Sequence, residues 1–227
     1  MNGILYVVPT PIGNLEDITF RAVRILQQVD TIVCEDTRQT VKLLSHLKIS
    51  KPLISFYTQN QLKRIPQIIT TLKEGKNIAL VSDCGTPAIS DPGYYLIKEA
   101  IDNDITVVPL PGACALITAL VGSGITTDSF VFLGFLRRKP GKMKKELELA
   151  KQTETTIIFY ESPHRILKTL EICKEVFGDD VNVVLARELT KKFEEFIRGS
   201  ITDVINNLSN RQILGEFAVI ISNKTNN

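Results

Sequence analysis

Short apolar runs rich in β-branched residues alternate with amphipathic segments through the first 110 residues. No other property of the sequence narrows the possible folds as much. In residues 18–29, for example, the hydrophobic positions recur at helical spacing, and the preceding apolar run, residues 4–8, reads as a buried strand. This alternation is typical of a parallel sheet covered by helices on both faces. We predict strands over 4–8, 31–34, 52–55, 77–81 and 106–110, and helices over 18–29, 37–47, 62–72 and 94–101, with Asp17 as a candidate cap for the first helix.

The spacing of the apolar runs changes after about Gly124. Closely spaced strand patterns near residues 188–199 predict a hairpin, and hence a mixed sheet. We therefore predict two α/β domains, residues 1–124 and 125–227, joined near the glycine-rich segment Val121–Asp128. In the second domain the predicted strands are 130–135, 155–160, 181–186, 194–197 and 217–222, and the predicted helices are 143–151, 163–177 and 201–208.

Composition excludes some classes of function. The formal net charge is only +2, so any contact with nucleic acid must come from a local patch. Four scattered cysteines lack metal-ligand spacing, which predicts reduced thiols, no metal site and a cytoplasmic location. No segment has the roughly eighteen consecutive apolar residues of a membrane span. The sequence also carries no Walker loop, which argues against phosphoryl transfer.

The segment Ser82–Gly93 is twelve residues long and holds two Gly, two Pro and two Asp. Plain strand-to-helix connections need about two to six residues, so this length indicates a functional loop rather than a decorated connector. Asp91 and Pro92 read as the cap and first position of the next helix. In parallel sheets, ligands bind where such loops gather at the carboxyl ends of strands.

Four other polar segments follow predicted strands: Thr10–Asp17, Cys34–Arg38, Pro109–Ala113 and Tyr160–Arg165. The second is either an acid/base cluster or a capped helix start with a surface ion pair. In the third, backbone amides at a helix start can meet a carboxylate or carbonyl. In the last, we expect Ser162 to cap a helix that Pro163 opens.

Residues 137–145 carry six basic residues and no acidic one. A run of this kind is either a solvated loop or an arm that contacts phosphates.

Taken together, these motifs resemble one family. The segments Thr-Pro-Ile-Gly-Asn-Leu-Glu-Asp, Cys-Glu-Asp-Thr-Arg, Ser-Asp-Cys-Gly-Thr-Pro-Ala-Ile-Ser-Asp-Pro-Gly, Phe-Tyr-Glu-Ser-Pro-His-Arg and Ala-Arg-Glu-Leu-Thr-Lys occur in this order. They are similar to those of the small-subunit ribosomal RNA methyltransferase I family, within the tetrapyrrole methylase superfamily of class III methyltransferases. The resemblance implies two α/β domains with S-adenosylmethionine in the cleft between them, and a homodimer. It also implies methylation of the ribose 2′-hydroxyl of a cytidine in the decoding centre of 16S rRNA, as naked RNA or in the small subunit.

The resemblance further implies which residues bind the cofactor. Carried over position by position, they are Pro11, Ser82, Asp83, Gly85, Thr86, Pro87, Ala88, Ile89, Pro111, Gly112, Ala113, Cys114, Ala115, Tyr160, Gly215, Glu216 and Phe217.

Transfer to a ribose hydroxyl benefits from a general base. The candidates are Glu35, Asp36, Asp83, Glu161, His164 and Glu188, and we favour Asp83 near the cofactor with Glu35 and Asp36 near the acceptor. For contacts with RNA we expect Arg38, Arg137, Arg138, Lys139, His164 and Arg165. Two other functions remain open from the sequence: methylation of a tetrapyrrole or another small molecule, and a non-catalytic RNA-binding assembly factor.

Overall fold

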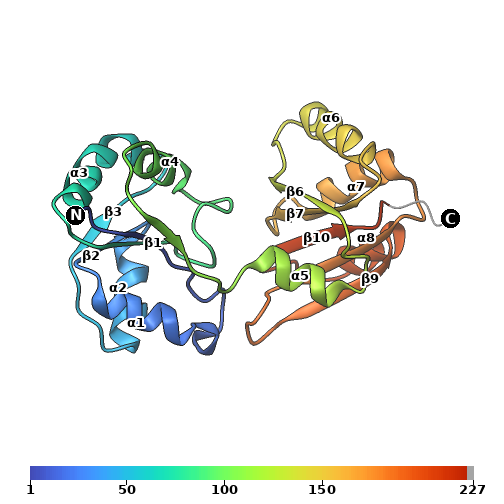
Figure 1. Cartoon of the computed structure of the whole chain (residues 1–227). Helices are drawn as coiled ribbons and strands as arrows, with labels where there is room; N and C mark the ends of the chain where they lie inside the picture. The colour runs from blue at the N-terminus through green and yellow to red at the C-terminus, as the bar shows by residue number, and fades with distance from the viewer. Residues whose placement is uncertain (224–227) are drawn as a thin grey trace. The chain divides into compact units, whose positions relative to one another are not determined.

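Within residues 1–223, which the computed structural model describes, ten strands form two separate five-stranded sheets. One sheet lies in the unit Met1–Cys114 and the other in the unit that begins at Ala115, and Figure 1 shows both. Each unit has its own hydrophobic core, as the hydrophobic content of 44% allows.

The first sheet is parallel throughout, with the order β3-β2-β4-β1-β5. Its strands match the predicted apolar runs to within a residue or two. They are β1 (Leu5–Val7), β2 (Thr31–Cys34), β3 (Leu53–Ser55), β4 (Ile78–Val81) and β5 (Val107–Pro109). Because every pair is parallel, the loops that follow these strands lie at one edge of the sheet.

Helices cover both faces of this sheet (Figure 1). On one face lie α1 (Phe20–Gln28) and α2 (Thr37–His46), and on the other α3 (Gln61–Lys73) and α4 (Tyr94–Asp102). Successive residues of β4 serve opposite faces: Ile78 and Leu80 pack with α3 and α4, while Ala79 and Val81 pack with α1 and α2. Burial on both faces is why these strands are apolar at every position.

Two helix starts in the first unit differ from the prediction. The N-cap residue of α4 is Gly93, at φ 147°, so Asp91 does not cap this helix. For α1 the cap is Thr19, whose Oγ1 accepts a hydrogen bond from the amide of Ala22 at 3.0 Å. Asp17 lies instead in a short 3-10 helix, η1 (Leu15–Asp17), two residues before the cap.

The second sheet is mixed, as predicted, and its strand order is β6-β7-β10-β8-β9. Only the β6–β7 pair is parallel, and β8 and β9 form the expected antiparallel hairpin. The strands are β6 (Phe130–Phe135), β7 (Thr156–Glu161), β8 (Asn182–Arg187), β9 (Glu195–Ser200) and β10 (Phe217–Ile221).

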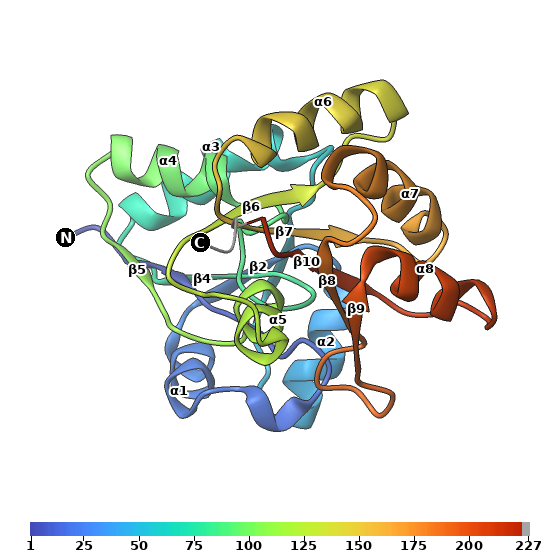
Figure 2. The same cartoon turned by 90° about the vertical axis from the view of Figure 1, so that its right-hand side faces the viewer.

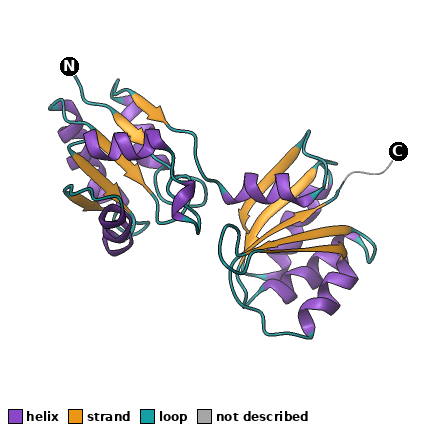
Figure 3. Ribbon diagram, turned by 90° about the horizontal axis from the view of Figure 1, so that it is seen from below, coloured by secondary structure: helices purple, strands orange, loops and turns teal. Residues whose placement is uncertain are grey.

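One face of this sheet is covered by α6 (Pro140–Lys151), α7 (Ile166–Phe177) and α8 (Ile201–Ser209). The opposite face carries α5 (Ala115–Ser123), which packs against β7, β8 and β10 (Figures 2 and 3). The start of α7 differs from the prediction: its first residue is Ile166, after a turn in which the Arg165 amide donates to the Ser162 carbonyl at 3.1 Å. Ser162 and Pro163 therefore belong to this turn and do not cap or open the helix.

The division between the units falls after Cys114, earlier than the predicted joint near Gly124. The intervening helix α5 belongs to the second unit because it packs on that unit's sheet. Arg198 of β9 also holds its C-terminal end, since its guanidinium donates to the carbonyls of Gly122 at 2.6 Å and Ser123 at 3.1 Å.

Candidate functional site

Four loops of the first unit are tied together at the carboxyl edge of the parallel sheet. Thr10, after β1, and Gly85, after β4, exchange backbone hydrogen bonds of 2.9 and 3.0 Å. The hydroxyl of Thr86 donates to the carbonyl of Ala113, after β5, at 2.9 Å. The amide of Asp36, after β2, donates to Oδ1 of Asp83 at 3.0 Å. The structure thus brings together the predicted residues of these four segments.

The backbone of these loops is held in conformations and close contacts that few residues tolerate. Ala88 and Ser90 have φ values of 69° and 67°, in the left-handed region that side chains usually avoid. At Gly112, a Cβ atom would lie 2.6 Å from Cβ of Pro9, so only glycine fits there without a shift. Residues 82–93 therefore form a specific structure and not a plain connector.

Four carboxyl groups gather at this edge: Glu35, Asp36, Asp83 and Asp91. Burial raises the pKa of Asp91 to about 7. The nearby charges of Glu35 and Asp83 also raise this pKa, whereas a hydrogen bond from Ser82 lowers it. Burial likewise raises the pKa of Glu35, with further contributions from Asp83 and Asp36. Two of these groups therefore favour the protonated form more than an exposed carboxyl does.

Asp36 behaves in the opposite way. Hydrogen bonds from the side chain and amide of Arg38 lower the pKa of Asp36 to about 2. The same carboxylate caps α2 and forms an ion pair with the Arg38 guanidinium at 2.7 Å. The segment Cys34–Arg38 thus contains both features that its sequence left open, an acidic cluster and a capped helix start with a surface ion pair.

In the second unit, the pairing of β7 with β10 sets Glu161 opposite Phe217 and Tyr160 opposite Ala218. The hydroxyl of Tyr160 accepts a hydrogen bond from the amide of Leu116 at 2.9 Å. The predicted cofactor residues Tyr160 and Phe217 therefore lie on adjacent strands, and Gly215 and Glu216 come just before β10.

Hydrogen bonds and ion pairs hold the Gly215–Phe217 segment in place. Oε1 of Glu188 accepts hydrogen bonds from the Glu216 amide at 3.0 Å and from Nζ of Lys191 at 2.9 Å. Lys191 reaches Oε2 of Glu216 at 2.8 Å as well. Glu188 and Lys191 come from the Ala-Arg-Glu-Leu-Thr-Lys motif, which accordingly positions the start of β10.

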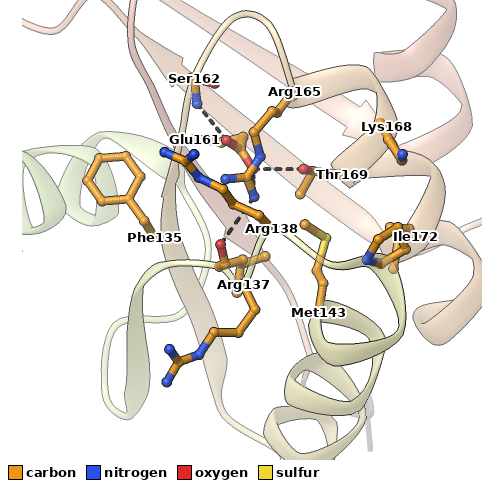
Figure 4. A pocket seen from close by; sticks show the side chains of 12 residues that line it. Phe135, Arg137, Arg138, Met143, Glu161, Ser162, Arg165, Lys168, Thr169 and Ile172 are labelled. Atoms are coloured by element: carbon orange, nitrogen blue, oxygen red, sulfur yellow. Dashed lines mark hydrogen bonds and ion pairs between the residues drawn. The ribbon is translucent and has the colours of Figure 1, made fainter.

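A pocket of about 760 Å³ lies in the second unit, among the end of β6, α6 and α7 (Figure 4). It combines an apolar wall with several cationic side chains. Its lining residues are Phe135, Leu136, Arg137, Arg138, Pro140, Met143, Glu161, Ser162, Arg165, Lys168, Thr169 and Ile172.

Glu161 organises this pocket from within. Its side chain is only 1% exposed, and Oε2 accepts a hydrogen bond from Thr169 at 2.7 Å and forms an ion pair with Arg165 at 3.1 Å. Oε1 accepts from the Ser162 amide at 2.7 Å. A buried carboxylate with this many partners fixes the residues around it.

Of the residues predicted to contact RNA, Arg137, Arg138 and Arg165 line the pocket. Lys139 and His164 are exposed nearby and do not line it, and Arg38 belongs to the first unit. Sequence reasoning missed Lys168, Thr169 and Ile172. With Arg165 they recur at helical spacing on one face of α7, a signal that was present in the sequence.

Comparison with known families identifies the class of enzyme. A family model described as Tetrapyrrole (Corrin/Porphyrin) Methylases matches residues 4–205, so the chain belongs to this family. A cobalt precorrin-4 methyltransferase structure has a TM-score of 0.72 at 18% identity and covers 96% of this chain and 94% of its own. Diphthine synthase has a TM-score of 0.75 at 11% identity, with coverages of 96% and 89%. The predicted fold class is confirmed.

Other relatives are much more similar in sequence. Ribosomal RNA small subunit methyltransferase I of Bacillus subtilis (strain 168) is 53% identical over 224 residues, which are 99% of this chain and 76% of that protein. The protein of the same name from Synechocystis sp. (strain ATCC 27184 / PCC 6803 / Kazusa) is 48% identical over 98% of this chain and 80% of its own length. Within the tetrapyrrole methylases, the chain belongs to the family of these methyltransferases.

Methylases of this family take their methyl group from S-adenosylmethionine. The loops of the first unit fit this cofactor because their carboxyl cluster suits a sulfonium cation.

Among residues 1–223, no helix is both long and apolar enough to cross a membrane. In the same part of the chain, no three His, Cys, Asp or Glu side chains are placed to hold a metal ion.

Proposed function

We propose that this protein methylates the ribose 2′-hydroxyl of a cytidine in the decoding centre of 16S rRNA, with S-adenosylmethionine as the methyl donor. The observation that carries the proposal is the identity of 53% over 99% of the chain to a protein named Ribosomal RNA small subunit methyltransferase I. The substrate is the 16S rRNA or the small ribosomal subunit, and the protein acts in the cytoplasm as a homodimer.

In the first unit, we assign cofactor binding to the loops joined at the edge of the parallel sheet. The supporting contacts are those of Gly85 with Thr10 and of Thr86 with Ala113. The assigned residues are Pro11, Ser82, Asp83, Gly85, Thr86, Pro87, Ala88, Ile89, Pro111, Gly112, Ala113 and Cys114. In the second unit, we assign the same role to Ala115, Tyr160, Gly215, Glu216 and Phe217.

When bound, S-adenosylmethionine supplies a methyl group that its sulfonium already activates. The protein therefore has to orient the acceptor hydroxyl, exclude water and take up one proton. Among the favoured carboxylates, Glu35 suits the last task best. Its pKa is raised, and no hydrogen-bond donor of residues 1–223 engages its carboxylate. Asp83 accepts a hydrogen bond from the amide of Asp36, and the low pKa of Asp36 makes it a weaker base than Glu35.

We assign contacts with rRNA phosphates to Arg38, Arg137, Arg138, Lys139, His164 and Arg165. The side chain of Arg38 is 86% exposed, and its neighbour Asp36 fixes its direction. A guanidinium held in this way can make paired hydrogen bonds with a phosphate.

The decisive experiment is methyl transfer from labelled S-adenosylmethionine to small subunits purified without the modification, and separately to naked 16S rRNA. Mapping the label to a cytidine 2′-oxygen in the decoding centre would support the proposal. Label at another nucleotide would overturn the site but not the reaction. Cofactor binding with no label on either substrate would favour a small-molecule methylase, and failure to bind the cofactor would favour an assembly factor.

A further inference from the structure

We propose that the pocket among β6, α6 and α7 binds one unpaired nucleotide of the RNA substrate, with its phosphate at Arg138 and Lys168 and its base against Phe135. This inference rests on the proposed rRNA substrate. It goes further by naming a binding site and by requiring that the bound nucleotide be single-stranded.

The charged side chains that line the pocket are mostly positive. Arg137, Arg138, Arg165 and Lys168 line it with a single carboxylate, Glu161. Of these cations, only Arg165 has an ion-pair partner within 4.0 Å among residues 1–223. Three unpaired cations in one pocket stand out in a chain with a net charge of only +2. The occupant that matches this charge is an anion.

One of the four cations is already fixed in place. Glu161 holds the Arg165 guanidinium at 3.1 Å, and the same guanidinium donates to the Leu136 carbonyl at 3.1 Å. Arg165 therefore belongs to the pocket wall and connects α7 to the end of β6. A pocket whose wall is ordered before binding loses less conformational entropy when a ligand enters.

The rest of the pocket has an exposed aromatic ring, an apolar wall and a volume larger than a phosphate ion needs. Phe135, at one end of the pocket in Figure 4, is 58% exposed, although its ring packs on Tyr160 with centroids 5.6 Å apart. Met143 and Ile172 add apolar wall, and the volume of about 760 Å³ exceeds what a phosphate fills.

An exposed aromatic ring beside unpaired cations is the combination that single-stranded nucleic-acid sites use, because the ring stacks on a base and the cations hold the backbone. In a duplex, the faces of the bases are already stacked on one another. The pocket therefore selects an unpaired nucleotide over a paired one.

The test measures binding of the full chain to a short fluorescent RNA, either as a single strand or annealed to its complement, at several salt concentrations. The variants are Phe135→Ala, Arg138→Ala and Lys168→Ala. The matched control is Lys142→Ala, which removes an exposed cation of the same basic run that does not line the pocket.

We expect the wild type to prefer the single strand. Phe135→Ala should weaken this binding about tenfold and leave the salt slope unchanged. Arg138→Ala and Lys168→Ala should each lower the slope of log affinity against log salt by about 0.7. The control should keep the wild-type affinity and slope. Equal losses of RNA affinity in Lys142→Ala and Arg138→Ala would overturn the proposed site in favour of a diffuse basic surface. Equal affinity for duplex and single strand would overturn it as well.

Two readouts separate this inference from the proposed reaction. Because Phe135 touches Tyr160, S-adenosylmethionine affinity is measured calorimetrically in each variant and should match the wild type. Methyl transfer to rRNA without a preference for single strands would overturn the pocket and leave the reaction standing. Pocket-dependent binding of single strands without methyl transfer to rRNA would support the pocket and overturn the reaction.

Discussion

Asp91 shows how one residue can satisfy a sequence pattern and still serve another purpose. Its Asp-Pro-Gly context is typical of a helix start, yet Gly93 takes the cap position of α4. The carboxyl group of Asp91 is instead partly buried near Glu35 and receives a hydrogen bond from Ser82. A capping pattern describes only neighbours in the chain, whereas the environment of Asp91 comes from a different loop.

The raised pKa of Asp91, about 7, makes stability depend on pH. The folded protein keeps this proton at pH values where an unfolded chain, with a pKa of about 4, has lost it. The stabilisation is therefore complete below about pH 4 and is lost as the pH rises through 7. Relative to the wild type, Asp91→Asn should gain about 1–2 kcal/mol in unfolding free energy between pH 4 and 8, after discounting for partial exposure.

Urea denaturation of both proteins across this pH range checks the expectation. Asp180→Asn, which removes an exposed carboxyl of the second unit, is the control and should show no such trend. A gap between Asp91→Asn and the wild type that stays constant with pH would contradict a protonated Asp91.

Glu35 allows a second prediction for a single residue. If its carboxylate takes the proton from the acceptor, Glu35→Gln should lower kcat by about 10²–10⁴-fold. The pKa of Glu35 is raised, so kcat of the wild type should increase with pH as the group ionises, and the variant should lose this dependence. The measurement is single-turnover methyl transfer against pH, with the exposed Glu16→Gln as the control. A variant with the wild-type rate and pH profile would exclude Glu35 as the base.

At the level of helices and strands, the sequence predicts where elements exist better than where they begin. Apolar runs and helical stripes identify the elements because burial over many positions leaves a repeated pattern. The beginning of a helix depends on one competing side chain. Thr19 rather than Asp17 caps α1, and a turn at Ser162 delays α7 until Ile166.

A contact between two elements gives the next prediction. Arg198 of β9 donates to the carbonyls of Gly122 and Ser123 at the end of α5, and it lies over the Phe196 ring with 4.8 Å to the centroid. Hydrogen bonds from a charged group contribute about 1.5–3 kcal/mol, and partial exposure reduces this. We expect Arg198→Ala to lower the unfolding free energy of the second unit by about 1–2 kcal/mol.

Chemical denaturation followed by a probe in the second unit measures this loss. Arg198→Lys should recover only part of it, because an ammonium cannot reproduce the fork of a guanidinium. Lys145→Ala, which removes an exposed cation of α6 with no ion-pair partner among residues 1–223, should be neutral. A neutral Arg198→Ala would show that α5 is held by packing alone.

Over the whole molecule, each unit has a core of its own, and this predicts local rather than uniform effects of core substitutions. Phe159 is fully buried in the second unit, so Phe159→Ala should cost about 3–5 kcal/mol. In hydrogen exchange, protection of β7, β8 and β10 should fall, while β1, β2 and β4 keep theirs. Leu80→Ala should give the reverse pattern. A uniform fall in both units would contradict separate cores.

How much of the candidate site the sequence predicts also depends on the fold of each unit. Around Thr10, Gly85 and Ala113 it predicts well, because parallel strands bring every following loop to one edge. Around the pocket it predicts the arginines and Glu161 but not Met143, which reaches the site through the packing of α6 against α7. The position of Met143 follows from side-chain packing, for which one sequence carries no direct pattern.

The division after Cys114 also bears on how the protein is made. The complete first sheet and both of its core clusters lie on the amino-terminal side of that point, and no strand crosses it. A ribosome adds about 5–20 residues per second, so residues 115–227 alone take on the order of ten seconds to be made. During that time the parallel sheet, whose strand pairs are distant in sequence and slow to meet, can fold without competition from the apolar strands that follow.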